Sequence, residues 1–474
     1  MAGHATTHDT SDERLVLGDR ARGVYGAASF LAIAGFVAAL VLGWFLGGSY
    51  MPLRRFFFAY LVAFCFFLSL SLGSLIIVLL QHVTRAAWSV GVRRILENVA
   101  ALMPVLGILA IPLIVTVAIE RGTVYRWALP LSRATPEAIH AAQNGEPDEE
   151  AETTATTSTQ SEQVKSENPE VQPEGEAVEA PKLILDSVTL QKRGWMNPWF
   201  WIARVVVYFI TWSIIAMWYR KQSLLQDETG DPELSRRMTY WAGLSLVIMG
   251  LTLTGAAGDF IMSLDPHWYS TMFGVYFFAG SFVSAWALPI LITRLVQKAG
   301  YLSRSVTREH YHDLGKWLFG FTFFWGYIAF GQYMLLWYAN IPEEIEWFNR
   351  HGATTVTRHI TGWSYLILSL LFGQLLIPFA GLLSRHVKRA IAILTFWAAW
   401  VLTFHFLDVY WMVMPEYHVA GGPHWTAVSL IVDLAALLGM GGLLTVVLLR
   451  LMAPHSLRPA QDPRFPEALA FVNS

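Results

Sequence analysis

The chain has 474 residues, of which 54% are hydrophobic and only 14% are charged, and its net charge is −2. Because soluble globular proteins carry roughly 25% charged residues, this composition argues against an ordinary soluble enzyme. The nearly neutral charge provides no basic surface for nucleic acid, and the single cysteine, Cys65, excludes a disulfide framework and an iron–sulfur cluster held by the chain's own thiolates. We therefore expect an all-α polytopic membrane protein.

Ten segments are long and apolar enough to cross the ~30 Å hydrocarbon core of a bilayer as helices. In chain order they cover residues 24–46, 56–80, 99–119, 198–218, 239–264, 271–292, 317–338, 363–383, 390–411 and 425–449. The first 23 residues are polar and of mixed charge, so no removable signal peptide is expected and the first span serves as the insertion signal.

An even number of spans places both termini on one side of the membrane, and the distribution of Lys and Arg indicates which side this is. The segments on the side of the termini hold 21 of these residues. The short loops on the other side hold four, namely Arg54, Arg55, Arg350 and Arg358. Both termini are therefore predicted to be cytoplasmic.

The spans divide the chain into five parts. A cytoplasmic tail (1–23) precedes membrane helices at 24–119, an extracytoplasmic connection (120–197), membrane helices at 198–449 and a cytoplasmic tail (450–474). Within the connection, residues 146–179 hold eleven Asp and Glu against one lysine, Lys165. Such a stretch cannot bury a core. It is interpreted as a solvated insertion or, alternatively, as a tether for a basic extracytoplasmic partner.

Five ionisable residues lie inside the predicted spans, where a charged side chain is costly and usually marks a pathway or a pair. They are Arg204, Asp259, His405, Asp408 and Asp433, all in the extracytoplasmic halves of their helices. His405 and Asp408 are three residues apart, so they share a helix face and could form a hydrogen-bonded pair that passes on protons. The five residues are candidates for a proton path or a quinone pocket. Alternatively, Arg204 neutralises one aspartate and the others cap helix ends.

Other polar residues lie near the ends of the spans. Asp265 and His267 are predicted at the extracytoplasmic rim, where turn chemistry explains them as well as function does. On the cytoplasmic side, His82 and Glu97 are candidates for a proton entrance, although an ion pair between Glu97 and Arg93 is the simpler interpretation. Four neutral residues inside spans could line a wetted interior or hold helices together: Tyr327, Gln332, Tyr333 and Gln374.

Motifs for other kinds of chemistry are missing from the sequence. A membrane haem of the b type needs two histidines that face each other from within spans, and only His405 lies well inside one. Neither a Gly-rich phosphate loop, a nucleophile elbow nor an H-E-x-x-H motif occurs. We expect no metal ligated by the chain's own side chains. Any redox chemistry must therefore use protons, quinone or cofactors that partner subunits hold.

Three segments carry a recognisable pattern. Residues 56–94 contain Phe-Phe-Phe-Ala-Tyr and Gln-His-Val-Thr-Arg-Ala-Ala-Trp, and residues 259–279 begin with Asp-Phe-Ile-Met-Ser-Leu-Asp-Pro-His-Trp-Tyr. Residues 312–342 contain His-Asp-Leu-Gly-Lys and Gln-Tyr-Met-Leu-Leu-Trp-Tyr. These segments resemble the NrfD-like (polysulfide reductase-type) membrane subunits of alternative complex III, and most of all the ActF type, the second of two paralogues. The resemblance extends over nearly all spans but not over the acidic insertion or the N-terminal tail.

The resemblance implies a pair of four-helix bundles with flanking helices in the bacterial inner membrane. It implies a subunit of a quinol:cytochrome c-type oxidoreductase that supplies a proton path, a quinone pocket or both. The implied partners are a paralogous NrfD-like membrane subunit, an iron–sulfur subunit, and multihaem and monohaem cytochrome c subunits, so that haem c and iron–sulfur clusters reside on partners. The alternatives are a purely structural membrane anchor of that complex and a secondary transporter.

Overall fold

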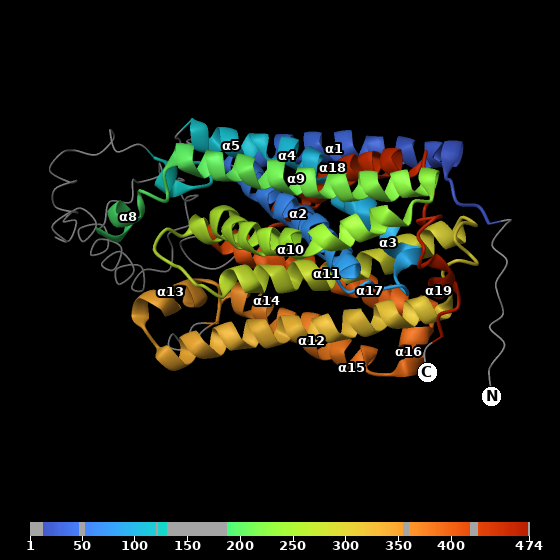
Figure 1. Ribbon diagram of the computed structural model, residues 1–474. Helices are drawn as coiled ribbons and strands as arrows, with labels where there is room; N and C mark the ends of the chain where they lie inside the picture. The colour runs from blue at the N-terminus through green and yellow to red at the C-terminus, as the bar shows by residue number, and fades with distance from the viewer. Residues whose placement is uncertain are drawn as a thin grey trace, which may run out of the picture.

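The computed structural model describes residues 13–46, 53–119, 122–129, 187–353, 360–417 and 425–472, so the acidic stretch 146–179 and Arg358 lie outside the described residues. In these ranges the chain forms helices and no strands. The long helices run side by side between two ends of the molecule (Figure 1). We call the end where α1 (Arg22–Leu46) begins and α18 (Ala427–Met452) finishes the terminal end, and the opposite one the far end.

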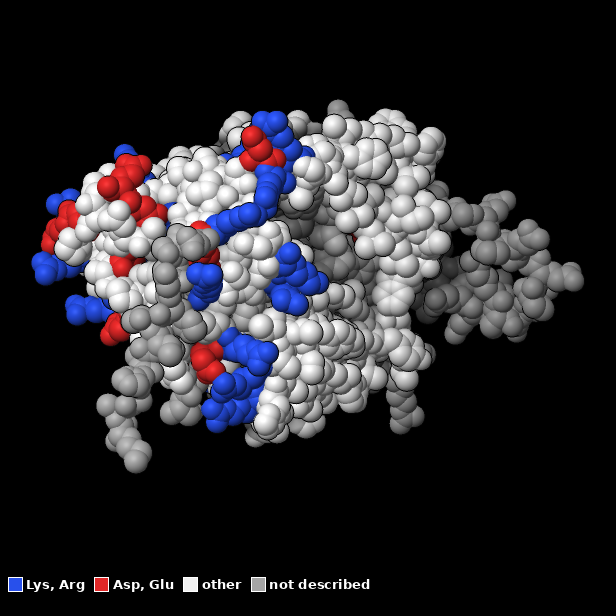
Figure 2. All heavy atoms as spheres, turned by 90° about the vertical axis from the view of Figure 1, so that its right-hand side faces the viewer, with Lys and Arg blue, Asp and Glu red and all other residues white. Residues whose placement is uncertain are grey.

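The beginning and the end of the described chain meet at the terminal end. The amide of Leu457 donates to the carbonyl of Leu15 at 2.9 Å, and the amide of Gly18 donates to the carbonyl of Ala453 at 3.1 Å. Figure 2 looks onto this end and shows Lys and Arg together with Asp and Glu on its surface. An even number of crossings between the two ends follows from this arrangement.

Within the described ranges, nine helical segments are long and apolar enough to span a membrane. They are Gly18–Leu46, Arg54–Val83, Val90–Ala118, Pro198–Thr229, Pro232–Leu264, Phe273–Lys298, Gly362–Leu382, Ile391–Glu416 and Ala427–Met452. Each of them contains most of one predicted span. The protein is thus a multi-pass helical membrane protein.

The remaining predicted span, 317–338, is the seventh in chain order and lies in α12 (Arg308–Ala339), which is not among these nine. This helix nevertheless runs alongside the others between the two ends (Figure 1). Its sequence mixes Gly, Tyr, Trp and Gln with Phe and Leu, which lowers its apolarity although its 32 residues exceed the length of a span.

One helix, α2 (Arg54–Val83), forms the centre of the molecule and is buried on almost every side. A helix that is apolar all round belongs in such a position. α18 packs against α2 and also against α1. The contact of α1 with α18 is close because small residues meet there: a Cβ on Gly35 would lie 2.5 Å from the backbone nitrogen of Gly439.

The remaining long helices form two groups around α2. The first group consists of α3 (Val90–Ala100), α4 (Met103–Leu109), α5 (Ile111–Ala118), α9 (Pro198–Thr229) and α10 (Pro232–Phe260). In this group α2 contacts α3, α4 and α10, and α9 contacts the other four helices. In the second group, α11 (Phe273–Lys298) contacts α12 and α17 (Ile391–Val413). Both α12 and α17 also contact a continuous segment made of α14 (Gly362–Leu370), the π-helix η5 (Leu371–Leu376) and α15 (Ile377–Leu382). α11 also packs on α2 and α10, which joins the groups.

Short helices cover the ends. Figure 1 places α8 (Ser187–Lys192) and α13 (Pro342–Arg350) at the far end, and α16 (Arg385–Arg389) and α19 (Phe465–Leu469) at the terminal end. Four further single turns are η1 (Gly18–Ala21), η2 (Arg126–Ala128), η4 (Met262–Leu264) and η6 (Met414–Glu416). Two aromatic side chains of α13, Trp347 and Phe348, line a pocket in the second helix group.

Candidate functional site

A pocket of about 670 Å³ lies in the second helix group. Its walls come from α11, α12, α13, the α14–η5–α15 segment and α17, and they are mainly aromatic and aliphatic. Aromatic side chains of this wall include Phe273, Tyr276, Trp325, Phe330, Tyr333, Trp347, Phe348, Tyr365 and Trp411. A largely apolar pocket with a few polar groups is the usual form of a site for a small organic ligand.

One buried acid, Asp408 on α17, is held by two side chains of this wall. The hydroxyl of Tyr276 donates to one carboxylate oxygen, and the indole Nε1–H of Trp325 donates to the other at 3.1 Å. Asp408 is 1% exposed. Tyr276 and Trp325 therefore connect the pocket wall to the buried carboxylate.

His405 lies one helical turn before Asp408, as the sequence spacing predicts, but the two side chains do not form the predicted hydrogen bond. Imidazole Nδ1 and carboxylate Oδ2 are 3.9 Å apart, beyond hydrogen-bonding distance. The other ring nitrogen, Nε2, lies 2.8 Å from the hydroxyl of Ser69 on α2. The prediction of a direct His–Asp bond was wrong because the donors nearest to the carboxylate come from neighbouring helices.

Two features equip the pocket wall for a polar ligand. The amide of Gln332 lines the pocket, is 5% exposed, and makes no hydrogen bond to the described residues. Leu371 and Leu375, also in the wall, belong to the π-helix η5, and π-helical turns recur at functional sites. The indole of Trp400 supports this turn by donating to the carbonyl of Gly373 at 2.7 Å. Gln332 is thus a free hydrogen-bonding group in an apolar wall.

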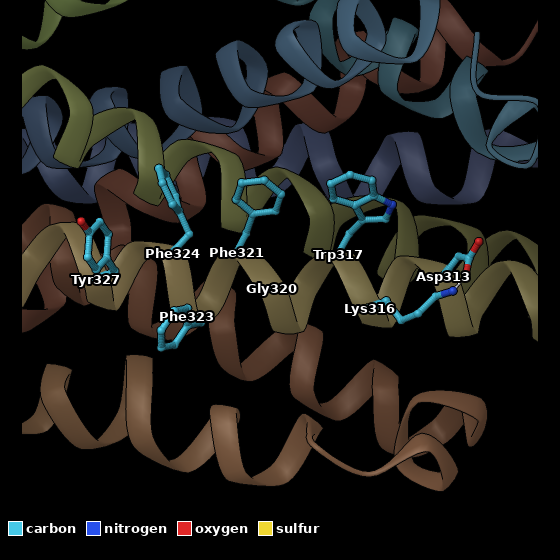
Figure 3. A pocket seen from close by; sticks show the side chains of 8 residues that line it. All are labelled: Asp313, Lys316, Trp317, Gly320, Phe321, Phe323, Phe324 and Tyr327. Atoms are coloured by element: carbon cyan, nitrogen blue, oxygen red, sulfur yellow. Dashed lines mark ion pairs between the residues drawn. The ribbon is translucent and has the colours of Figure 1, made fainter. Parts of the chain in front are cut away.

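A second hollow, of about 600 Å³, lies along α12 alone (Figure 3). Trp317, Phe321, Phe324 and Tyr327 point to one side of this helix, whereas Phe323 points to the other. Its polar end is the ion pair of Lys316 with Asp313. Because this hollow is an open groove on one helix whereas the first pocket is walled by several, the first is the better candidate for a functional site.

The predicted residues Arg204 and Asp259 form a two-pronged ion pair between α9 and α10. The guanidinium Nη2 and Nε lie 2.6 and 2.9 Å from the two carboxylate oxygens, and Tyr208 donates to the same carboxylate at 2.9 Å. The alternative that Arg204 neutralises an aspartate is thus the arrangement observed. This pair ties two helices of the first group together.

Asp433 also has an arginine partner, which the sequence did not indicate. Arg55 Nη2 lies 2.7 Å from its carboxylate and 2.8 Å from the carbonyl of Ser429, so α2 is linked to α18. Both charged side chains are buried. Arg55 was assigned to a loop because it precedes the apolar run, whereas in the structure it belongs to the first turn of α2.

The predicted rim residues lie in the turn between α10 and α11, at the far end. Asp265 is buried and forms ion pairs with Arg350 of α13 and, at 3.6 Å, with His267, which is exposed. Burial alone would raise the pKa of Asp265, but the hydrogen bond from His267 and the charge of Arg350 lower that pKa to about 2. Arg350 also lies 3.5 Å from Glu416. This cluster fixes α13, and with it one wall of the pocket.

The predicted residues near the terminal end, His82 and Glu97, lie in a different environment. Glu97 forms ion pairs with Arg93 at 3.1 Å and with Arg94 at 2.9 Å. Arg93 forms a second ion pair, with Asp462 of the C-terminal segment, at 2.5 Å. The ion pair of Glu97 with Arg93 is therefore present, within a larger network. His82 is fully buried, and neither ring nitrogen has a hydrogen-bond partner among the described residues.

The structure thus separates the five residues predicted inside spans into three arrangements. Among the five, only Asp408 is hydrogen-bonded to side chains of the pocket wall. In the part of the chain that the structure describes, no group of three His, Cys, Asp or Glu side chains could hold a metal ion. Comparison of the sequence with protein-family models and with curated proteins finds no match.

Proposed function

We propose that this chain is an NrfD-like membrane subunit of a quinol:cytochrome c-type oxidoreductase, alternative complex III, and that its pocket binds quinol. The sequence resemblance supports the family. The two helix groups around α2, with α1 and α18 beside them, fit the paired four-helix bundles and flanking helices of that fold. The proposed partners are a paralogous membrane subunit, an iron–sulfur subunit and cytochrome c subunits, which would carry the redox centres.

The observation that carries the quinol proposal is the link between the pocket wall and Asp408. Quinol is a flat aromatic ring with two hydroxyl groups, and oxidation to quinone releases two protons and two electrons. An aromatic pocket accommodates the ring. The phenol oxygen of Tyr276 can accept a quinol proton while its own proton passes to Asp408, to which it already donates.

Each group in this site has a distinct role in the proposal. Gln332 provides an amide that can hydrogen-bond a quinol oxygen, and Trp325 keeps the carboxylate of Asp408 directed toward the wall. The electrons leave to an iron–sulfur or haem centre of a partner subunit. This chain therefore binds the substrate and removes protons, while electron transfer requires the assembled complex.

A specific observation also favours a second candidate, a structural anchor. The ion pairs of Arg204 with Asp259 and of Arg55 with Asp433 join helices and need no substrate. Anchoring alone, however, does not account for a pocket whose wall bonds a buried acid that has no arginine partner among the described residues.

Replacement of Asp408 by Asn tests the proposal in the complex purified from its own membrane. The oxygen of Asn can accept from the Trp325 indole and its NH2 can donate to the Tyr276 oxygen, but Asn cannot take up the proton. Quinol:cytochrome c turnover should therefore fall about 100-fold with normal assembly. Asp19→Asn, an exposed change at the terminal end, is the matched control and should leave turnover unchanged. Equal turnover in both variants would contradict the role of Asp408 and favour the anchor.

A further inference from the structure

The imidazole of His405 is enclosed by three helices, and the groups that face it and Asp408 are neutral. They are Phe66 and Ser69 from α2, Tyr276 and Gly280 from α11, and Trp325 from α12. His405 itself is fully buried. Its Nδ1 has no hydrogen-bond partner among the described residues, although it lies on the side of Asp408. The position of the ring proton therefore decides what this histidine can do.

The hydroxyl of Ser69 indicates where that proton lies. Its single hydrogen can be donated once, and the carbonyl oxygen of Phe66 lies 2.6 Å from the hydroxyl oxygen, closer than His405 Nε2 at 2.8 Å. If the hydrogen is donated to the carbonyl, the hydroxyl oxygen must accept from Nε2–H of His405. A neutral imidazole carries one ring hydrogen, so Nδ1 then has a lone pair.

The distance to Asp408 supports this assignment. In the opposite tautomer an Nδ1–H would face a carboxylate, and such charge-assisted bonds are about 2.8 Å long. The observed separation of Nδ1 and Oδ2 is 3.9 Å. When Nδ1 carries no hydrogen and Asp408 is ionised, both atoms are hydrogen-bond acceptors. They cannot bond each other, which explains the wide gap between them.

Packing keeps the ring in this place. A Cβ on Gly280 would lie 3.0 Å from His405 Cε1, 3.2 Å from Nδ1 and 3.4 Å from Asp408 Oδ2. A larger residue at this position would therefore press on the ring and the carboxylate, which would have to shift by a few tenths of an ångström. The ring of Phe66 also packs against the imidazole, with 5.7 Å between the two ring centroids.

We propose that Ser69 is a positioning residue that holds His405 in the Nε2–H tautomer, which makes Nδ1 the acceptor of a proton from Asp408. The proposal rests on the proposed quinol function. When a quinol O–H bond breaks, Tyr276 relays a proton to Asp408. The O–H bond of the resulting carboxylic acid then breaks as Nδ1–H forms, which yields imidazolium and restores the carboxylate. Asp408 can now take the second quinol proton, and both electrons leave to the partner's redox centre.

The test measures the tautomer and the turnover separately. In the whole complex with ¹⁵N-labelled histidine, solid-state NMR gives distinct nitrogen shifts for the two tautomers, and the His405 signal is identified by its loss in His405→Gln. The resting complex, without quinol, should show Nε2–H. Ser69→Ala should shift the signal toward Nδ1–H, lower turnover about tenfold and change its pH profile, and Ser69→Thr should restore all three.

Ser74→Ala is the matched control, because this buried hydroxyl on the same helix bonds only the carbonyl of Leu70. It should change neither the tautomer nor the pH profile. An Nδ1–H signal in the resting complex, or a Ser69→Ala complex with unchanged tautomer and pH profile, would overturn the proposal. Absence of quinol turnover in the unmodified complex would instead reject the proposed function, and the resting-state spectrum would still decide the tautomer.

Discussion

Asp408 differs from the other buried aspartates of the membrane region in the kind of group that holds it. Asp259 and Asp433 each bond an arginine, so a cation balances their charge. The hydrogen bonds of Asp408 come instead from a tyrosine and a tryptophan, which are neutral. A carboxylate that has no ion pair to lose can take up a proton without leaving a buried cation unpaired. This difference favours Asp408 for the proposed proton chemistry, whereas the ion pairs of the other two hold helices together.

The first prediction compares the stability of these aspartate variants. Asp433→Asn leaves the buried guanidinium of Arg55 without its counter-charge, which should lower the free energy of unfolding by about 3–5 kcal/mol. Asp259→Asn does the same to the partly buried guanidinium of Arg204 and should cost somewhat less. In Asp408→Asn the oxygen can accept from the Trp325 indole and the NH2 can donate to the Tyr276 oxygen, so no cation is left unpaired and the loss should be clearly smaller. Thermal unfolding of the three variants in the same detergent provides the comparison. An equal loss in all three would show that Asp408 is also a structural acid.

The sequence could locate these acids because an ionisable residue stands out in an apolar span. It could not identify their partners. Tyr276, Trp325 and Ser69 are residue types that occur throughout membrane helices, and nothing in their spacing relates them to Asp408. Their role depends on which helices are neighbours, and that information lies in the packing of α2, α11, α12 and α17.

At the scale of the elements, the position of helix α12 was predicted correctly, but its lower apolarity was not recognised. The predicted span 317–338 falls within this helix, but its apolarity is lower than that of the nine candidate spans. One side of α12 contributes Trp325, Gln332 and Tyr333 to the pocket. Some of the residues that lower the apolarity of α12 are therefore the same residues that line the pocket. The π-helix η5 could not be predicted because no sequence pattern specifies the widened turn.

The second prediction concerns Gln332 on α12. Gln332→Leu removes the free amide from the pocket but keeps the size of the side chain, so the fold should be retained. The loss of one neutral hydrogen bond, worth ~1 kcal/mol, should weaken the binding of a quinol analogue about fivefold. Equilibrium binding to the purified complex measures this change. Tyr327→Phe, which lies in the open groove of the same helix, should leave the affinity unchanged.

At the scale of the whole molecule, the pocket lies between the terminal end and the far end, and separate ion pairs stabilise each of these ends. At the terminal end, Arg93, Glu97 and Asp462 join α3 to the C-terminal segment, and at the far end Arg350 joins α13 to Asp265. The prediction that both termini lie on one side agrees with the meeting of the chain's described ends. That this side is cytoplasmic, and that the chain belongs to alternative complex III, stay predictions.

Photoaffinity labelling of the purified complex with an azidoquinone tests the central claim, that quinol binds in the pocket beside Asp408. Mass spectrometry of the digested chain should find the label on pocket residues of α12 and α14, such as Phe330, Tyr333 and Tyr365, and excess quinol should prevent the labelling. Labelling confined to the groove of α12 around Phe323, or to other subunits, would contradict the claim.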